Sequence, residues 1–221
     1  EISNNSKIPN WKVRNSNSYY LKSFLENLPF DFIEKKILRD NDLIKFKKEI
    51  KINLKSNTDI IITSGAVSAG KFDFVPKIIH SFKLKYYFKG SYIRPGKPIM
   101  FAKFKKNKAF FGLPGNPISS AACFRFFVLP FLYFSIGTLE NKPIISKIKN
   151  QLIKKKNFTR FIKGKLSFSK NGIAEFEAYK GQESFRIKPF TKSNAWGLFP
   201  NGKRKFKKGD IIQCYTSTGI N

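Results

Sequence analysis

Residues 110–124 read FFGLPGNPISSAACF, and they join an aromatic run to a long apolar stretch through two glycines, two prolines and an asparagine. The pattern predicts a strand that ends in a sharp turn, after which Asn116 can cap a helix and Pro117 suits the first helical position. Ser119 and Ser120 are expected to expose hydroxyls beside free amide hydrogens, which would suit a phosphate or carboxylate. A plain strand, turn and helix start satisfies the same pattern, and both interpretations can hold.

The composition of the 221-residue chain limits its class. A 41% apolar content with 25 Phe is enough for a hydrophobic core, and the length fits one large domain or two ordinary ones. The formal net charge of +29 invites a nucleic-acid or acidic-membrane partner. Lysines nevertheless recur in nearly every segment instead of gathering on one helix or arm, so we favour a compositional bias. We therefore expect no specific nucleic-acid partner.

Cysteine usage and hydropathy point to the cytoplasm. Cys123 and Cys214 lie far apart, with neither disulfide-rich nor metal-site spacing, which fits a reducing compartment. The sequence shows no secretory n-region and h-region pattern. Residues 118–137 approach the length that spans a bilayer, but Arg125 and Pro130 lie near the middle of this stretch. We favour a buried helix there and expect no membrane partner.

Strand-like and helix-like runs alternate from residue 10 to about residue 140. Apolar spacing predicts helices over residues 16–28, 41–54, 74–82 and 116–137. β-branched and aromatic runs predict strands over residues 30–38, 59–63, 85–93, 99–104 and 109–111. Such alternation implies a three-layer α/β domain over residues 1–142, in which helices flank a mostly parallel sheet.

The pattern changes after residue 142. Short alternating runs predict strands over residues 160–169, 173–179, 184–190 and 210–217, and turns rich in Gly, Lys and Asn separate them. No helix is predicted in this part of the sequence. Residues 143–221 are therefore expected to form a second, small all-β domain.

One predicted strand is followed by a glycine-rich loop, TSGAVSAGKFD at residues 63–73. Ligands of open α/β sheets bind beyond the carboxyl ends of the strands, so such loops are where chemistry is expected. Gly65 and Gly70 permit a tight backbone there, and Ser64 offers a hydroxyl. Asp73 is either a helix N-cap or a carboxylate that holds a magnesium ion bridging phosphates.

A second loop, RPGKP at residues 94–98, places Arg94 and Lys97 around a Pro-Gly turn, with Lys89 a few residues earlier. A basic turn alone means little in so basic a chain. Combined with free amide donors, however, fixed cations of this kind would hold an anionic ligand.

The order SGAVSAGKFD, RPGKP and GLPGNPISS, followed by a hydrophobic helix and a small β domain, resembles the molybdopterin molybdenumtransferases, the MoeA and gephyrin E-domain family. The resemblance covers nearly the whole chain. It implies a MogA-like, molybdopterin-binding α/β domain and a barrel-like C-terminal domain in a homodimeric cytoplasmic enzyme. The implied reaction takes adenylylated molybdopterin and molybdate, with Mg²⁺, and yields molybdenum cofactor and AMP.

The resemblance also implies roles for individual residues. Asp40 and Asp73 match acidic site residues of the family and are expected to hold the metal. Arg94 and Lys97 match the basic residues of the Pro-Gly turn, and Lys89 matches another basic site residue, although this segment contains one extra residue. The phosphates of the nucleotide and the pterin would be lined by loop residues: Ser64, Gly65, Ser68, Gly70, Gly112, Pro114, Gly115, Asn116 and Ser119.

The sequence departs from the family pattern in two ways. Ala66 stands where the family has a second glycine, and we expect its methyl group to require an ordinary φ, which would limit backbone approach to a ligand. Family members are also longer, and Glu1 resembles the end of the Thr-Gly-Asp-Glu turn that closes their first strand. The chain is therefore expected to be a fragment that lacks this strand and is inactive alone.

Three other functions stay open. Molybdopterin adenylyltransferases share the α/β domain and similar glycine loops, but the Asn-Pro after GLPG and the trailing β domain favour the insertase. A basic nucleic-acid-binding module would carry an Arg-rich stripe with interleaved aromatics, and the sequence has no such stripe. A scaffold that keeps the fold without turnover is the third alternative, and the Ala66 departure and the expected truncation keep it open.

Overall fold

The computed structural model describes residues 13–26, 28–34, 37–38, 42–67, 74–138 and 142–217. Internal contacts divide the chain into two compact units. Unit 1 comprises Glu1–Gly90 and Pro98–Ala121, and unit 2 comprises Ser91–Lys97 and Ala122–Asn221. The sequence-predicted division between residues 142 and 143 stays a prediction.

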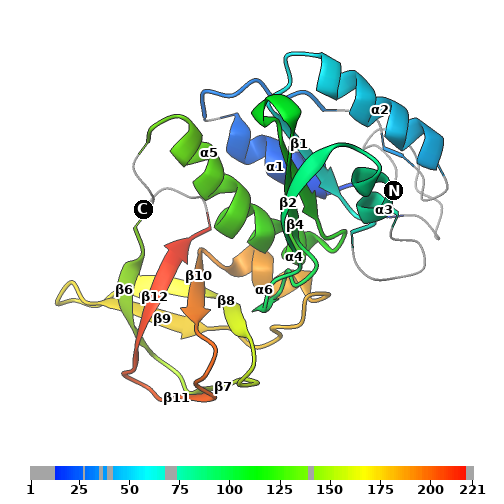
Figure 1. The fold of residues 1–221 in the computed structure, drawn as a ribbon. Coiled ribbons are helices and arrows are strands. Elements are labelled where there is room, and N and C mark those ends of the chain that lie inside the picture. Colours follow the sequence, from blue (N-terminus) through cyan, green and yellow to red (C-terminus); the bar gives the residue numbers. More distant parts are fainter. Residues whose placement is uncertain are drawn as a thin grey trace. The chain divides into compact units, whose positions relative to one another are not determined.

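Unit 1 contains a four-stranded sheet in the order β1-β5-β4-β2 (Figure 1). The strands are β1 (Ile60–Ser64), β2 (Leu84–Lys89), β4 (Met100–Phe104) and β5 (Ala109–Leu113). β1 and β5 pair in parallel, whereas β4 is antiparallel to both β5 and β2. Three of the four strands therefore run in one direction, and the predicted α/β class is confirmed with a mixed sheet. β5, at an interior position, is buried along its whole length.

Three helices of unit 1 accompany this sheet: α1 (Asn17–Leu25), α2 (Leu43–Lys55) and α3 (Val75–His80). Each matches a predicted helix, because its apolar residues recur at helical spacing. In α2, Phe46 and Ile50 are four residues apart and both are buried, while the exposed positions hold lysines together with Leu43, Ile44 and Ile52. Both side chains join a core that includes Ile79 of α3 and Phe110 of β5. One apolar stripe per helix thus suffices to cover the sheet.

A long helical segment runs through α4 (Pro117–Cys123), a π-helical turn η2 (Phe124–Val128) and α5 (Leu129–Ser135). Pro130 has no amide hydrogen and cannot donate to the carbonyl of Phe126, so the widened turn just before it accommodates the break. By length and composition Pro117–Ser135 could cross a membrane, with a mean hydropathy of 1.5, but 61% of the segment is buried inside the protein. That burial is typical of a core helix.

Unit 2 is built on a closed barrel of five strands (Figure 1). The order is β10-β12-β6-β9-β8, and β8 pairs back onto β10. Only the β6–β9 pairing is parallel among these described ladders. The strands are β6 (Ile144–Ile148), β8 (Thr159–Phe168), β9 (Ala174–Ala178), β10 (Ala195–Phe199) and β12 (Ile211–Thr216). The predicted small barrel-like domain is confirmed.

Three short strands complete unit 2. β3 (Ile93–Arg94) lies parallel to the start of β8, and β7 (Leu152–Ile153) pairs with β11 (Lys205–Phe206). The pairing of β3 with β8 explains why the segment Ser91–Lys97, which precedes the barrel in sequence, belongs to the same compact unit.

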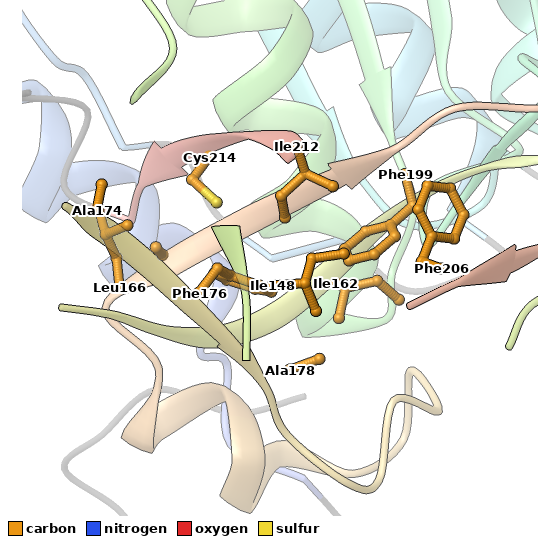
Figure 2. Packing of buried hydrophobic residues seen from close by; sticks show 11 residues of the cluster. Ile148, Ile162, Leu166, Ala174, Phe176, Ala178, Phe199, Phe206, Ile212 and Cys214 are labelled. Atoms are coloured by element: carbon orange, nitrogen blue, oxygen red, sulfur yellow. The ribbon is translucent and has the colours of Figure 1, made fainter. Parts of the chain in front are cut away.

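The barrel interior is organised around Phe176 (Figure 2). This ring is fully buried, and it packs against the backbone of β8 and β10 at two glycines. A Cβ added at Gly164 would overlap the Phe176 ring and the carbonyl oxygen of Glu177, and one added at Gly197 would lie 2.7 Å from the same ring. Both glycines are therefore required by close packing, since a narrow barrel leaves no space for a side chain beneath a phenylalanine.

Two predicted strands are wrong. The described part of residues 30–38 contains no strand: Ile33 and Ile37 are exposed there, and Leu38 packs against the core of unit 1 without joining a sheet. Residues 184–190 lead instead into a short helix, α6 (Ile187–Lys192). Pro189 fits a first helical turn and cannot donate to a strand ladder, which explains the difference. The sequence analysis also missed β6 and β10, because their short apolar runs lack clear alternation.

Replacing Gly197 by alanine is expected to lower the free energy of unfolding by about 1–3 kcal/mol, because the new methyl group would press on the Phe176 ring. Urea denaturation measures this change. The double variant Gly197→Ala, Phe176→Leu should lose less than the sum of the two single variants, because a smaller side chain relieves the overlap. Strict additivity would contradict this packing.

Candidate functional site

The candidate site of unit 1 lies where β1 and β5 end. The two strands are parallel neighbours, so the loops that follow them leave the same edge of the sheet. Ser64 pairs with Leu113 at the last register position, and the amide of Gly65 then donates to the carbonyl of Leu113 at 2.9 Å. The glycine-rich loop and the GLPGNP turn are thereby hydrogen-bonded to each other where they leave the strands, although they lie 50 residues apart in sequence.

The two loops touch backbone to backbone. A Cβ added at Gly115 would lie 3.3 Å from the Cα of Gly65, so any side chain there would push the loops apart. Gly112 is buried inside β5, and a Cβ there would lie 2.8 Å from Val67. Pro114 is also buried, whereas Gly115 is exposed. The glycines of this motif therefore serve contact between the loops as well as access to a ligand.

The helix that follows begins as the sequence predicts. The Asn116 side-chain oxygen accepts from the amide of Ser119 at 3.2 Å, its carbonyl accepts from Ser120 at 2.8 Å, and Pro117 is the first residue of α4. The expectation of exposed hydroxyls is wrong, however, because Ser119 is 7% exposed and Ser120 is 1% exposed. The core packing of α4 turns both side chains inward, and the Ser119 amide is occupied by the cap.

A residue that sequence reasoning missed connects the two loops. Asn17, the first residue of α1, donates from its side-chain nitrogen to Ser64 Oγ at 2.6 Å and to the carbonyl of Gly115 at 2.9 Å. Ser64 Oγ in turn approaches the carbonyl of Pro114 at 3.4 Å. The sequence signals only a helix start here, because an asparagine at this position is also an ordinary cap residue.

Ala66 contradicts the expectation of an ordinary φ. Its φ is 52°, in the left-handed region, and it follows Gly65, whose φ is 98°. The carbonyl of Ala66 accepts from the amide of Val75 at 3.1 Å, which ties the loop to the start of α3. An alanine in this conformation costs about 1–2 kcal/mol. The loop thus keeps a glycine-like backbone without the glycine.

Four of the predicted site residues lie outside the described residues: Asp40, Ser68, Gly70 and Asp73. Their roles stay predictions. Within the part of the chain that the structure describes, no group of three His, Cys, Asp or Glu side chains could hold a metal ion.

The predicted cations fall in both units. Lys89 ends β2 in unit 1, opposite Met100 of β4, and is exposed. Arg94 and Lys97 belong to unit 2, where both are exposed. The loop that carries them is closed by the Ser91 amide, which donates to the carbonyl of Lys97 at 2.9 Å, and the Arg94–Pro95 peptide is cis.

Arg94 belongs to a cluster of cations in unit 2. It lies directly opposite Arg160 in the β3–β8 ladder, and its guanidinium stacks 4.4 Å from the ring centroid of Phe158. Burial, together with repulsion from Arg94, lowers the pKa of Arg160, and attraction to Glu183 opposes the shift. Burial, and then repulsion from Arg160, lowers the pKa of Lys154, whose ammonium donates to the carbonyl of Phe158 at 2.9 Å.

Arg160 was missed because one more basic residue is inconspicuous in a lysine-rich sequence. Its Nε atom is buried and has no hydrogen-bond partner among the described residues. Like charges held side by side on neighbouring strands are unfavourable unless an anion lies between them. The only signal in the sequence is that an arginine, rather than the usual lysine, stands here.

Lys163 is a buried cation with a structural task. It is 1% exposed, and its ammonium donates to the carbonyls of Gly181, Glu183 and Arg186 at 3.1–3.3 Å. Burial lowers its pKa to about 8; Glu183 opposes the shift and Arg160 adds to it. The side chain therefore fixes the segment that leads into α6.

Replacing Ala66 by glycine is expected to raise the free energy of unfolding by up to about 1 kcal/mol. The substitution removes the steric cost of a methyl group at φ 52°, and the greater flexibility of glycine in the unfolded chain offsets part of the gain. Urea denaturation of both proteins gives the difference. A clear loss of stability would mean that the methyl group contributes packing that outweighs the strain.

The contribution of Lys163 should depend on pH. Its folded pKa of about 8 lies below the ordinary lysine pKa of 10.5, so the unfolded chain holds the proton more tightly between these two values. The free energy of unfolding of the wild type should therefore rise with pH, relative to Lys163→Met, by about 1.4 kcal/mol per pH unit from pH 8 to pH 10. A difference that stays constant over this range would contradict the lowered pKa. Lys165→Met, at an exposed position of β8, corrects for the loss of one lysine.

Known families match both parts of the chain. Residues 2–133 match the family described as "Probable molybdopterin binding domain", and residues 146–216 match the "MoeA C-terminal region (domain IV)". The chain is 31% identical over 210 residues to a molybdopterin molybdenumtransferase of Staphylococcus aureus, covering 94% of this chain and 49% of that protein. A protein of the same name from Staphylococcus epidermidis is 31% identical over 205 residues, with coverages of 91% and 48%.

Solved structures show the same fold. A molybdopterin biosynthesis MoeA protein of Pyrococcus horikoshii superposes with a TM-score of 0.77 at 19% identity, over 98% of this chain and 51% of that one. A molybdenum cofactor biosynthesis protein of Pyrococcus furiosus gives a TM-score of 0.67 at 18% identity, over 90% and 64%. The chain spans about half the length of the curated relatives it matches. It belongs to the molybdopterin-binding domain family, as a relative of the MoeA molybdopterin molybdenumtransferases.

Proposed function

We propose that the chain acts in the insertion of molybdenum into adenylylated molybdopterin, a transfer that yields molybdenum cofactor and AMP. The family match and the name of the staphylococcal relatives support this function. In the proposed division of labour, residues 1–142 form the molybdopterin-binding domain and residues 143–221 the C-terminal β domain. The extents of the two family matches support that division.

The observation that carries the proposal is a set of backbone donors at the joined loops of unit 1. Among the described residues, the amides of Ala66, Gly115 and Asn116 donate to no backbone or side-chain acceptor. Successive free amides in a turn attract phosphate, because they offer directed partial positive charge without a side chain. We infer that these three amides receive the phosphates of the pterin nucleotide. Gly65, whose own amide donates to Leu113, is proposed to line the loop.

The cation cluster of unit 2 supports the proposal that the chain binds molybdate, the second substrate. Arg94 and Arg160 are adjacent in register, and two guanidiniums side by side suit a tetrahedral oxyanion with several acceptor oxygens. Molybdate is such an anion. We propose that these two arginines bind it, and that Lys97, in the same unit, neutralises further negative charge. Lys89, in unit 1, stays a predicted basic site residue.

Charge neutralisation explains why such a reaction needs these groups. Pyrophosphate and molybdate are both anions, and fixed cations and backbone amides lower the cost of binding such anions. Asp40 and Asp73 are proposed to hold Mg²⁺, which would polarise the bridging phosphate as AMP leaves. Ser64, Ser68, Gly70, Gly112, Pro114 and Ser119 are proposed as further lining or support of the phosphate loops.

We further propose that the enzyme is a cytoplasmic homodimer whose partners are its small-molecule substrates rather than nucleic acid or membrane. The resemblance to the insertase family supports the dimer, and the unlinked cysteines, both buried, are consistent with a reducing compartment.

Binding and turnover assays test the proposed function. The 221-residue chain is expected to bind adenylylated molybdopterin, and to consume no ATP when given molybdopterin, ATP and Mg²⁺. The expectation from the sequence is that this chain alone does not turn over, so molybdate-dependent AMP release would contradict that expectation and still support an insertase. ATP consumption would favour an adenylyltransferase, and failure to bind the nucleotide would overturn both.

Molybdate binding tests the arginine pair. Arg94→Gln and Arg160→Gln are each expected to weaken the binding of molybdate about 10-fold, because each removes a charge-assisted hydrogen bond. Isothermal titration at fixed ionic strength measures the dissociation constant. Lys165→Gln, on the same strand as Arg160, is the control for the loss of one positive charge. Equal weakening in all three variants would reduce the effect to general electrostatics.

A further inference from the structure

We propose that Asn17 is a positioning residue that keeps the peptide between Gly115 and Asn116 oriented with its amide hydrogen toward the anion. This inference rests on the proposed function for its ligand, but its structural part can be tested without any ligand. No motif of the sequence analysis includes Asn17, and the residue comes from a helix that carries no predicted site residue.

Asn17 uses both hydrogens of its side-chain amide. One goes to Ser64 Oγ at 2.6 Å and the other to the carbonyl oxygen of Gly115 at 2.9 Å. These acceptors lie 47 and 98 residues away in sequence, one in each loop of the site. A single side chain therefore sets the spacing of the two loops and the direction of one carbonyl.

The direction of that carbonyl decides what a ligand meets. In a trans peptide the C=O and the N–H point in opposite directions, so binding the Gly115 oxygen to Asn17 aims the Asn116 amide the other way. Asn116 N–H is one of the donors without a partner among the described residues. If the peptide turned over, an oxygen would face the anion in place of a hydrogen. Glycine makes such a turnover easy, because it tolerates both backbone conformations.

The support behind Asn17 is rigid. The residue is 4% exposed, and Leu21 and Leu25 of the same helix are buried at 6% and 5%. The helix start is fixed separately by Asn15, whose side chain donates to Ser18 Oγ at 2.7 Å and accepts from the Ser18 amide at 3.3 Å. Asn15 therefore braces the turn that leads into the helix, and Asn17 is left to hold the loops. A buried donor that lost both acceptors would be costly, so the arrangement favours one peptide orientation.

Asn17→Asp is the sharpest test, because it keeps the size of the side chain and removes both donors. We expect AMP to bind at least about 10-fold more weakly to this variant, while adenosine, which has no phosphate, binds as it does to the wild type. The Asn116 amide should also exchange its hydrogen at a different rate in the ligand-free protein. Asn15→Asp, which carries the same charge change two residues before the helix begins, should behave like the wild type in all three measurements.

The outcomes separate the positioning role from a structural one. Equal weakening of AMP and adenosine, or unchanged AMP binding with an unchanged Asn116 amide, would overturn the proposal. If the wild type bound no AMP, the proposed function would fail, and the Asn116 amide alone would decide the role of Asn17. Should Asn17→Asp not fold, Asn17→Ser keeps one donor and is expected to weaken AMP binding about threefold, again without affecting adenosine.

Discussion

The contact between two backbones is the constraint on which unit 1 depends. Where β1 and β5 end, Gly65 and Gly115 lie so close that a methyl group on Gly115 would not fit without movement. The parallel pairing of the two strands places their loops at the same edge of the sheet. The contact between Gly65 and Gly115 then makes the two loops one continuous surface. Amide donors can gather there because no side chains intervene. The glycines of the motif are therefore required first for the contact between the two loops and only then for access of a ligand to the amide donors.

Unit 2 contains two kinds of partly or fully buried cation, one with hydrogen-bond partners and one without. Lys163 is buried, but three carbonyls of one segment accept from it, so its charge is used in the fold. Arg160 is only half-buried, but its Nε atom is buried without a partner among the described residues, and Arg94 lies opposite it in the β3–β8 ladder. Satisfied buried cations are structural, whereas an unsatisfied pair invites an anion. This distinction is what separates a functional cluster from the general basicity of the chain.

Much of this architecture follows from the sequence, because periodicity and turn chemistry act locally. Asn116 and Pro117 predict a helix start whatever surrounds them, and in the structure α4 does begin at Pro117. Burial and partners are decided by the whole fold, so Ser119 was expected at the surface and is in the core. Ala66 shows that a loop hydrogen-bonded to β5 before it and to the start of α3 through its carbonyl can hold an alanine at a positive φ. The roles of Asn17 and Arg160 depend on residues far away in sequence, which no local pattern contains.

The most direct test of the account is a titration of the ¹⁵N-labelled chain with AMP, followed by the amide signals of Ala66, Gly115 and Asn116. If the two joined loops bind the phosphate, these three signals should shift together and saturate at one AMP concentration. That concentration should be lower than the one at which the amides of the barrel strands shift. Shifts confined to the lysine-rich surface, with these three signals unmoved at saturating AMP, would contradict the central claim.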